Sequence, residues 1–364
     1  MQQITQPTLI LDERKCKTNI AQMAHKAKDA GVEFRPHFKT HQSLEIGRWF
    51  KEHGVAKITV SSVGMAQYFA TEWDDILIAF PVNVRELAAI NELAGRVKLS
   101  LLVESAEVLE LLHEKLTHPV SFYIKIDTGA HRTGVAPTDF ASIDQILAAA
   151  KQPGKLKFVG FLSHAGHTYH TNTITDILKI RNDENLAMLQ LKAHYIGSHP
   201  GIIASIGDTP SCSLVDHFSG IDEIRPGNFV FYDLMQLSFG SCSPGQIAVA
   251  VACPVVALHK DRNEMVIYGG GVHLSKDMLR INQSPVYGQL VEKEGDGWGE
   301  PIPGMIVKRL SQEHGIVSLP ETQKDKFDIG DLVYVLPVHS CMTADIYNQY
   351  ITTDSKNIER FRHS

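Results

Sequence analysis

Residues 31–41, GVEFRPHFKTH, set the pattern on which the fold prediction depends. The run at 31–34 predicts a short β-strand, and the polar stretch 35–41 follows it directly. Lys39 stands in that stretch between His37 and His41. Such a lysine is either an ordinary solvated loop side chain or an amine held in a pocket to form a Schiff base. Residues 31–41 alone leave both interpretations open.

The same succession of strand and polar loop recurs along the first two thirds of the chain. Further strand-like runs lie at 58–60, 75–79, 98–103, 121–126, 158–162, 202–206 and 223–225. Segments of helical period separate them, among them 84–94, 106–115 and 174–194. About eight β/α units predict an α/β fold of the (β/α)8 TIM barrel type rather than a doubly wound sheet. No Gly-x-Gly-x-x-Gly follows the first strand, so a dinucleotide-binding start is not supported.

The chain changes character after about residue 240. Strand-like runs at 247–258, 264–268, 315–319 and 331–336 are separated by Gly, Pro and Asp, and 294–299 (EGDGWG) predicts a hairpin tip. A mostly β domain is the natural interpretation. The predicted organisation is a barrel at 15–240, with 1–14 and 241–364 forming a β-rich domain.

Composition excludes several classes of partner. The 364 residues carry a net charge of −6, which argues against nucleic acid or an anionic membrane as the partner. No apolar run reaches the length of about 18 residues that a membrane span needs, and the start of the chain lacks a signal-peptide pattern. The five scattered cysteines are typical of reduced thiols. We therefore expect a cytoplasmic protein that acts on a small molecule.

Polar, glycine-rich segments follow several of the predicted strands. They are 127–134 (DTGAHRTG), 163–169 (SHAGHTY), 207–210 (GDTP) and 225–228 (RPGN). Because strand ends of a barrel meet at one mouth, these segments predict a site for a phosphate-bearing ligand there. Thr209 could donate a hydroxyl to the phosphate. Arg132 either provides a charge near the ligand or pairs with Asp127.

A second signal lies in the β-rich part, within 336–343 (LPVHSCMT). In extended chain, residues two apart point to the same side, so His339 and Cys341 could bind one metal ion. Imidazole and thiolate together favour Zn²⁺ over Mg²⁺. Two protein ligands would leave positions open for water and substrate, as in catalytic sites.

Together these motifs resemble one family. Pro-His-x-Lys-Thr-His, Asp-x-Gly-x-x-Arg-x-Gly, Gly-x-x-Thr-Pro, Arg-Pro-Gly-Asn and the late Pro-x-His-x-Cys are similar to those of fold-type III pyridoxal-phosphate enzymes. The nearest resemblance is to D-serine dehydratases and D-threonine or 3-hydroxy-D-aspartate aldolases. It implies an alanine-racemase-type barrel with a C-terminal β domain, and a homodimer.

The resemblance also implies roles for single residues. Lys39 would be the Schiff-base lysine of pyridoxal 5'-phosphate, Arg132 would lie near the ring oxygen and Tyr169 near the ring nitrogen. The phosphate would be bound by Thr209, Gly227 and Asn228, with a backbone role for Gly270 and Gly271. A divalent metal, Zn²⁺ by its ligands, would be held by His339 and Cys341. The chain departs from the family at residues 60–63 (VSSV), where a cofactor contact is in doubt, and at its Gly-Gly-Gly run, 269–271.

These parts imply a metal-dependent lyase acting on a D-3-hydroxy amino acid. The main prediction is a D-serine dehydratase-like elimination that gives a 2-oxo acid and ammonia. The alternative is an aldolase that releases glycine and an aldehyde, with His164 or His167 as base; Cys341 favours the dehydratase, since the aldolases tend to carry Asp there. Two further alternatives stay open. One is a racemase with a tyrosine base from Tyr268, Tyr287 or Tyr334, and the other is a non-catalytic cofactor carrier.

Overall fold

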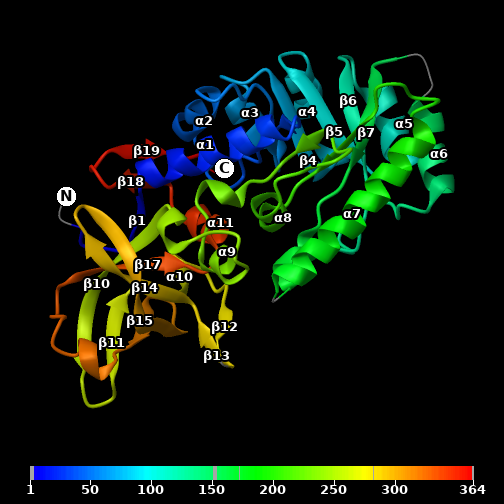
Figure 1. Ribbon diagram of the computed structural model, residues 1–364. Helices are drawn as coiled ribbons and strands as arrows, with labels where there is room; N and C mark the ends of the chain where they lie inside the picture. The colour runs from blue at the N-terminus through cyan, green and yellow to red at the C-terminus, as the bar shows by residue number, and fades with distance from the viewer. Residues whose placement is uncertain (1–3, 151–153, 172, 282, 363–364) are drawn as a thin grey trace. The chain divides into compact units, whose positions relative to one another are not determined.

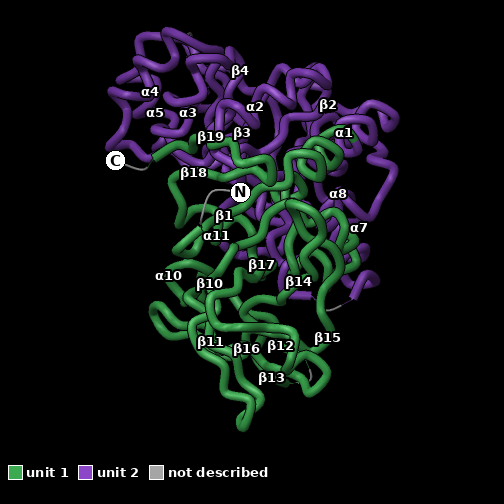
Figure 2. The backbone as a smooth tube through the Cα atoms, turned by 90° about the vertical axis from the view of Figure 1, so that its left-hand side faces the viewer, with its two compact units in different colours: residues 1–21, 228–362, 364 green, residues 22–227, 363 purple. Residues whose placement is uncertain are grey.

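The chain forms two compact units. A computed structural model describes residues 4–150, 154–171, 173–281 and 283–362. One unit is Gln22–Gly227; the other runs to Ala21 and resumes at Asn228–Arg362 (Figure 2). The predicted domain limits were 15–240 for the barrel and 1–14 with 241–364 for the β-rich part. They remain predictions of where independently folding domains begin and end.

The Gln22–Gly227 unit is built on eight parallel strands in the order β2-β9-β8-β7-β6-β5-β4-β3. Four of them, β4 to β7, are labelled in Figure 1. His37, just beyond β2, pairs with Thr59 of β3, so the two ends of the sheet are joined. This closed order confirms the predicted alanine-racemase-type barrel. The strands are β2 (Glu33–Phe34), β3 (Ile58–Val60), β4 (Asp75–Pro81), β5 (Lys98–Val103), β6 (Val120–Lys125), β7 (Leu156–Leu162), β8 (Ile203–Ile206) and β9 (Glu223–Ile224).

Helices alternate with these strands, and several begin at a capping side chain. Ser62, Ser105, Thr173 and Asp208 each accept a hydrogen bond from the backbone N–H three residues on, which satisfies one open donor of the first turn. The helices are α1 (Glu13–Asp29), α2 (Leu44–Lys51), α3 (Val63–Phe69), α4 (Leu87–Ala94), α5 (Ala106–Lys115), α6 (Phe140–Ala150), α7 (Ile174–Tyr195) and α8 (Thr209–Leu214), with 3-10 turns η1 (Val84–Glu86) and η2 (Gly166–His170).

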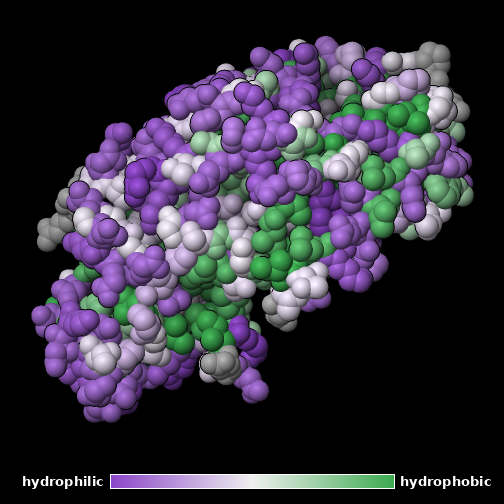
Figure 3. All heavy atoms as spheres, in the orientation of Figure 1, coloured by the Kyte–Doolittle hydropathy of each residue, from purple (hydrophilic) through white to green (hydrophobic). Residues whose placement is uncertain are grey.

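Apolar side chains of neighbouring strands form the barrel's core. Leu77, Leu102, Tyr123 and Leu162 pack together. Strands covered on both faces are buried along most of their length, as β5 and β6 are here. On the face drawn in Figure 3 the surface is mostly hydrophilic, with hydrophobic side chains gathered beside α7 and α8.

The second unit is mostly β, as predicted. Its main sheet has the order β11-β16-β15-β14-β17-β10-β1-β18-β19, and β10 also pairs with β11, so six strands form a closed ring. The strands are β1 (Thr8–Leu11), β10 (Val249–His259), β11 (Glu264–Tyr268), β14 (Gly288–Glu294), β15 (Gly297–Leu310), β16 (His314–Ser318), β17 (Leu332–Pro337), β18 (Gln349–Thr352) and β19 (Asn357–Glu359), with a separate pair β12 (Leu279–Ile281) and β13 (Ser284–Val286). Glu294 pairs with Gly297 across Gly295 at φ +58°, which confirms the predicted hairpin tip.

Short helices interrupt this sheet. They are η3 (Asn228–Val230), α9 (Leu234–Ser238), η4 (Pro244–Gln246), α10 (Gly271–Leu274), η5 (Glu321–Gln323) and α11 (Ser340–Asp345). Across the described parts of the chain, no helix combines the length and apolar character that crossing a membrane requires.

Candidate active site

The segment that carries Lys39 is anchored on both sides at the carboxyl end of β2. The His37 N–H donates to the Pro226 carbonyl at 3.0 Å, and the Phe38 N–H donates to the Thr59 carbonyl at 2.8 Å. The Lys39 N–H lies 3.3 Å from His37 Nδ1. The Lys39 side chain is exposed rather than enclosed in a pocket of its own unit. The backbone therefore fixes where the lysine leaves the barrel mouth.

Two histidines lie within the electrostatic reach of Lys39. Burial, and then the positive charge of Lys39, lower the pKa of both His37 and His164 well below the ordinary value. His164 Nδ1 lies 2.6 Å from the Gly207 carbonyl, so Nδ1 carries the proton and Nε2 the lone pair. His164 is thus a neutral imidazole with a fixed tautomer near Lys39.

His41 has a different setting from these two. It is buried, and its ring packs 4.4 Å from Phe38 and is stacked 5.6 Å from Phe50, measured between ring centroids. His41 is therefore part of the aromatic core that supports the lysine segment.

A buried polar network lies inside the barrel. Arg225 donates to the Ser163 carbonyl at 2.5 Å and to the Ser205 hydroxyl. Burial and the charge of Arg225 lower the pKa of Lys125 to about 8. Neither role was predicted from the sequence: Lys125 appeared only within an apolar run, and Arg225 only as part of a loop motif.

The predicted phosphate side is formed by the ends of β8 and β9. Asp208 Oδ2 accepts hydrogen bonds from the Ser211 N–H at 2.9 Å and the Thr168 hydroxyl at 3.1 Å, and Thr209 is buried beside it. Burial raises the pKa of Asp208 to about 6.

This part of the barrel fits an anionic cofactor. The charges of Lys39, Lys125 and Arg132 all act on His164, so positive groups outnumber negative ones around that imidazole. The buried Thr209 and Ser211 hydroxyls, in the first turn of α8, bring further donor groups to this end of the barrel. The residues present are therefore compatible with pyridoxal phosphate.

Arg132 and Tyr169 lie in the loops that follow β6 and β7. Arg132 is exposed, and Asp127 is bound by the Gly129 and His131 N–H groups and by the His131 ring instead of by Arg132. The Asp127–Arg132 ion pair is thus not formed. Tyr169 is half-buried in η2.

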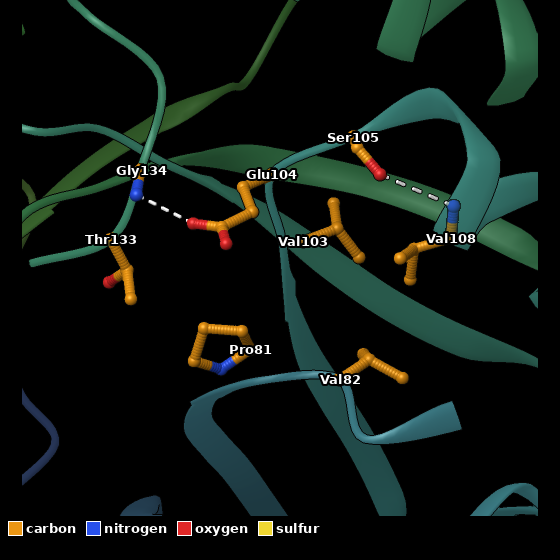
Figure 4. Close-up of a pocket in the computed structure, with 8 residues that line it drawn as sticks. All are labelled: Pro81, Val82, Val103, Glu104, Ser105, Val108, Thr133 and Gly134. Carbon is orange, nitrogen blue, oxygen red and sulfur yellow. Dashed lines mark hydrogen bonds between the residues drawn. The ribbon is translucent and has the colours of Figure 1, made fainter. Parts of the chain in front are cut away.

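A cavity of about 440 Å³ opens at the ends of β4 and β5 (Figure 4). Glu104 points across it and accepts a hydrogen bond from the Gly134 N–H at 2.6 Å, which ties β5 to the segment 127–134. The remaining lining residues are Pro81, Val82, Val103, Ser105, Val108 and Thr133. Lys39 is not part of this lining, so the cavity does not enclose the predicted lysine.

Gly227 packs directly against the lysine segment. A Cβ at this position would lie 2.8 Å from the His37 carbonyl oxygen and 3.0 Å from His37 Cβ. We expect Gly227→Ala to lower stability by about 1–3 kcal/mol through overpacking, and to weaken cofactor binding because residues 37–39 must shift. Thermal unfolding and an absorbance titration with pyridoxal phosphate measure the two effects. Gly197→Ala is the matched control, since a Cβ there meets nothing within 4 Å; equal behaviour of the two variants would contradict the expectation.

The predicted metal pair lies where β17 ends and α11 begins. The premise of an extended segment is wrong: His339 is extended, with φ −132° and ψ 100°, but it caps α11, and Cys341 stands in the first helical turn. The chain turns into a helix here because the Thr343 N–H donates to the His339 carbonyl at 3.1 Å. The two side chains are nevertheless hydrogen-bonded to each other. Burial lowers the pKa of His339, but Cys341, Asp233 and Asp277 outweigh it and raise the pKa to about 9.

Asp233 holds the segment between the two predicted ligands. This fully buried carboxylate accepts from the Ser340 N–H at 2.9 Å and from the Asn228 side-chain amide at 2.7 Å, both through Oδ2. The same Asn228 amide lies 3.5 Å from Cys341 Sγ. The Asn228 side-chain amide is therefore bound to Asp233 and lies beside Cys341, so that only the Asn228 backbone would be available to bind a phosphate. No sequence spacing signalled Asp233.

The backbone N–H groups of Gly270 and Gly271, predicted to bind the phosphate, form hydrogen bonds within the second unit. The Gly270 N–H lies 3.2 Å from His273 Nδ1, and the Gly271 N–H donates to the Ser311 carbonyl at 2.8 Å. A Cβ on Gly270 would lie 2.2 Å from the Gln312 carbonyl oxygen, so this glycine permits close backbone packing. Both N–H groups therefore already have a partner in this structure, and their phosphate role stays a prediction.

The donor set at His339 and Cys341 fits a metal with two protein ligands. No group of three or more His, Cys, Asp or Glu side chains arranged for a metal ion occurs among the residues that the structure describes. Two neighbouring ligands, an imidazole nitrogen and a thiolate sulfur, suit a catalytic metal ion, which keeps coordination positions open for water and substrate.

The fold and these residues define a class of pyridoxal-phosphate enzyme. The family model described as alanine racemase, N-terminal domain, matches residues 11–234, and the one described as putative serine dehydratase domain matches residues 248–353. The chain belongs to the alanine racemase N-terminal domain family, a pyridoxal-phosphate-dependent family. The predicted family is confirmed.

Individual relatives narrow the class. D-serine dehydratase of Dictyostelium discoideum is 28% identical over 98% of this chain and 95% of its own length. D-threo-3-hydroxyaspartate dehydratase of Delftia sp. (strain HT23) is 28% identical over 94% of this chain and 93% of its own length. A solved structure of a D-threo-3-hydroxyaspartate dehydratase, a cysteine-to-alanine variant in the metal-free form, has a TM-score of 0.91 at 26% identity, covering 99% of this chain and 98% of that one. Relatives named 3-hydroxy-D-aspartate aldolase and D-threonine aldolase also match. These names confirm the predicted enzyme class, a pyridoxal-phosphate-dependent lyase.

Proposed function

We propose that this chain eliminates water from a D-3-hydroxy amino acid such as D-serine, so that a 2-oxo acid and ammonia are released. The observation that carries the proposal is the pair His339 and Cys341, hydrogen-bonded to each other in a chain that is 28% identical to two dehydratases. The proposal requires that Lys39 and this pair act on one substrate, within one chain or across two copies.

The barrel residues would bind the cofactor and move a proton. When bound, pyridoxal phosphate supplies an electron sink for the Cα electron pair, and a divalent metal supplies a Lewis acid for the β-oxygen. Lys39 would hold the cofactor and, once displaced by the substrate amine, take the Cα proton onto Nζ. Arg132 and Tyr169 would orient the ring, while Thr209, Gly227 and the Asn228 backbone would bind the phosphate. Because it is neutral, His164 would be better suited to pack beside the cofactor ring than to act as an acid.

The second unit would bind the metal and the leaving group. A β-hydroxyl is a poor leaving group, so its departure needs a positive partner at the oxygen. His339 and Cys341 would hold that partner, and their nitrogen and sulfur favour Zn²⁺. The hydrogen bond from the Ser340 N–H to the Asp233 carboxylate would keep His339 and Cys341 at a fixed separation.

The aldolase alternative uses the same groups and has one structural observation in its favour. Nε2 of His164 is a proton acceptor near Lys39, because Nδ1 is bound to the Gly207 carbonyl. Incubation with D-serine, D-threonine and 3-hydroxy-D-aspartate, with and without Zn²⁺, separates the two. Oxo acid and ammonia support the dehydratase, whereas glycine and an aldehyde would overturn it in favour of the aldolase.

Removal of the metal is expected to stop elimination without releasing the cofactor. A Lewis-acid contribution of several kcal/mol corresponds to a loss of about 10²–10³-fold in kcat. Chelation of the wild type, and the variants His339→Ala and Cys341→Ser, should show this loss while the cofactor absorbance persists. Cys242→Ser is the control, since this half-buried thiol stands outside the pair. Full activity after complete chelation would contradict the metal's role and favour a racemase.

Two further parts of the proposal concern the protein's setting. The resemblance supports a homodimer, which sedimentation analysis tests, and the scattered cysteines support a cytoplasmic location. A protein that binds the cofactor but turns over no D-amino acid would be a carrier instead.

A further inference from the structure

The His339 ring lies beside a carboxylate that has no part in the chemistry above. His339 Nδ1 is 3.7 Å from Asp277 Oδ2, and the two side chains are 26% and 34% exposed. A carboxylate facing one ring nitrogen favours the proton on that nitrogen and leaves the other as the ligand nitrogen. Asp277 facing Nδ1 therefore assigns Nε2 to the metal.

The backbone before Asp277 holds the carboxylate in this direction. Ser275 adopts φ +65°, a left-handed conformation that is unfavourable for a residue with a side chain. Its hydroxyl donates to Asp277 Oδ2 at 3.1 Å and accepts from the Asp277 N–H at 3.2 Å. Strain of this kind persists only where the surroundings determine it, and it is concentrated at functional sites.

The segment that carries Asp277 is also tied to the helix that carries Cys341. The Thr343 hydroxyl donates to the Leu274 carbonyl at 2.9 Å, and the Tyr347 hydroxyl donates to the His273 carbonyl at 3.1 Å. Residues 273 and 274 are thus hydrogen-bonded to α11 and to Tyr347, which follows it. The carboxylate keeps its place relative to both predicted ligands.

We propose that Asp277 is a positioning residue of the metal site, which holds the His339 imidazole with Nε2 directed at the metal. The inference rests on the proposed function, because it presupposes a metal at His339 and Cys341. The contact that Asp277 makes at the pair is with the His339 ring, at 3.7 Å, and among the described residues it does not form a three-ligand group with His339 and Cys341. An incidental surface ion pair would share the geometry but would leave metal affinity unchanged.

The test is the Zn²⁺ affinity of the cofactor-loaded, full-length protein, measured by competition with a chromophoric chelator. Asp277→Asn and Asp277→Ala are expected to bind Zn²⁺ about 10–100-fold more weakly than the wild type. Ser275→Ala should weaken it in the same direction by less, because only the hold on the carboxylate is lost. At saturating Co²⁺ the thiolate charge-transfer band should persist in all three, since Cys341 still binds.

Controls separate the possible failures. Asp325→Asn removes a carboxylate that pairs with Lys260 and should bind Zn²⁺ as the wild type does. If the wild type itself binds no Zn²⁺, the metal site of the proposed function fails and the inference falls with it. If the wild type binds but His339→Ala does not, and Asp277→Asn equals the wild type, only the inference is overturned. A lower melting temperature with unchanged Zn²⁺ affinity would show a merely structural role and would also overturn it. Should Asp277→Asn fail to fold, Ser275→Ala decides by the same criterion.

Discussion

Lys39→Ala is expected to lose both turnover of D-serine and covalent attachment of the cofactor. The amine has two tasks in the proposal, and loss of the general base alone reduces a rate by about 10²–10⁴-fold. Reduction with borohydride, followed by peptide mass analysis, should locate the reduced cofactor on Lys39 in the wild type. In Lys39→Ala the reduced protein should carry no adduct, although cofactor can still bind reversibly.

Two other lysines make this experiment decisive. Lys57 is an exposed barrel lysine paired with Glu33 at 2.8 Å, so Lys57→Ala should keep the adduct and the activity. Lys125 is the competitor, because burial lowers its pKa to about 8, so a larger fraction of its amine is unprotonated and able to form a Schiff base at neutral pH. An adduct on Lys125, or one that persists in Lys39→Ala, would contradict the assignment.

Glu223→Ala is expected to destabilise the barrel by about 3–5 kcal/mol. The buried Arg35 guanidinium, which keeps its second partner Asp75, and the buried Ser205 hydroxyl each lose an acceptor, and an unsatisfied buried donor costs about 1–3 kcal/mol. Glu223 Oε2 lies 2.7 Å from Arg35 Nε, and the two side chains are 1% and 5% exposed. Glu223 also accepts from the Ser205 hydroxyl at 2.6 Å. Denaturant unfolding followed by circular dichroism measures the loss.

The exposed ion pair between Glu33 and Lys57, beside Glu223 on the adjacent strand, is the matched control. Glu33 is the register partner of Glu223 in β2, but its pair with Lys57 is exposed, so Glu33→Ala should change stability by only about 0–1 kcal/mol. Equal losses for the two variants would contradict the importance of burial.

The same residue predicts how stability depends on pH. Burial opposes ionisation of Glu223, but Arg35, the Ser205 hydroxyl and Arg225 together outweigh it and lower the pKa in the folded protein. The stabilisation is therefore complete above the unfolded pKa of about 4.3 and is lost as the pH falls through the lower, folded pKa. Glu223→Gln should lose this part of the acid dependence.

The barrel was predictable because its signals are local. Each strand is a short apolar run, and several of the following helices carry their own period and capping residue, as Ser105 before α5 shows. The position of Lys39 at a strand end follows from the same pattern. The contents of the barrel were not predictable, since Glu223 and Arg225 at β9 and Lys125 of β6 stand on strands that two others separate in the sheet, about a hundred residues apart in the chain.

The predicted metal ligands show the same difference between local signals, which could be predicted, and long-range contacts, which could not. His339 and Cys341 were found from their spacing, but the helical turn at Ser340 was missed, because the apolar run before it suggested continued strand. Asp233 and Asp277 are separated from the pair by more than sixty residues. Contacts over such separations leave no periodic trace in a single sequence.

The most direct test of the central claim is pyruvate formation from D-serine, titrated with Zn²⁺ in metal-stripped, cofactor-loaded protein. The account predicts almost no pyruvate without metal and a rate that rises in proportion to added Zn²⁺ until each chain holds a single ion. His339→Ala should show no such rise. Pyruvate formed at the full rate without any metal, or no pyruvate at saturating Zn²⁺, would contradict a lyase in which a lysine-bound cofactor and a metal act on one substrate.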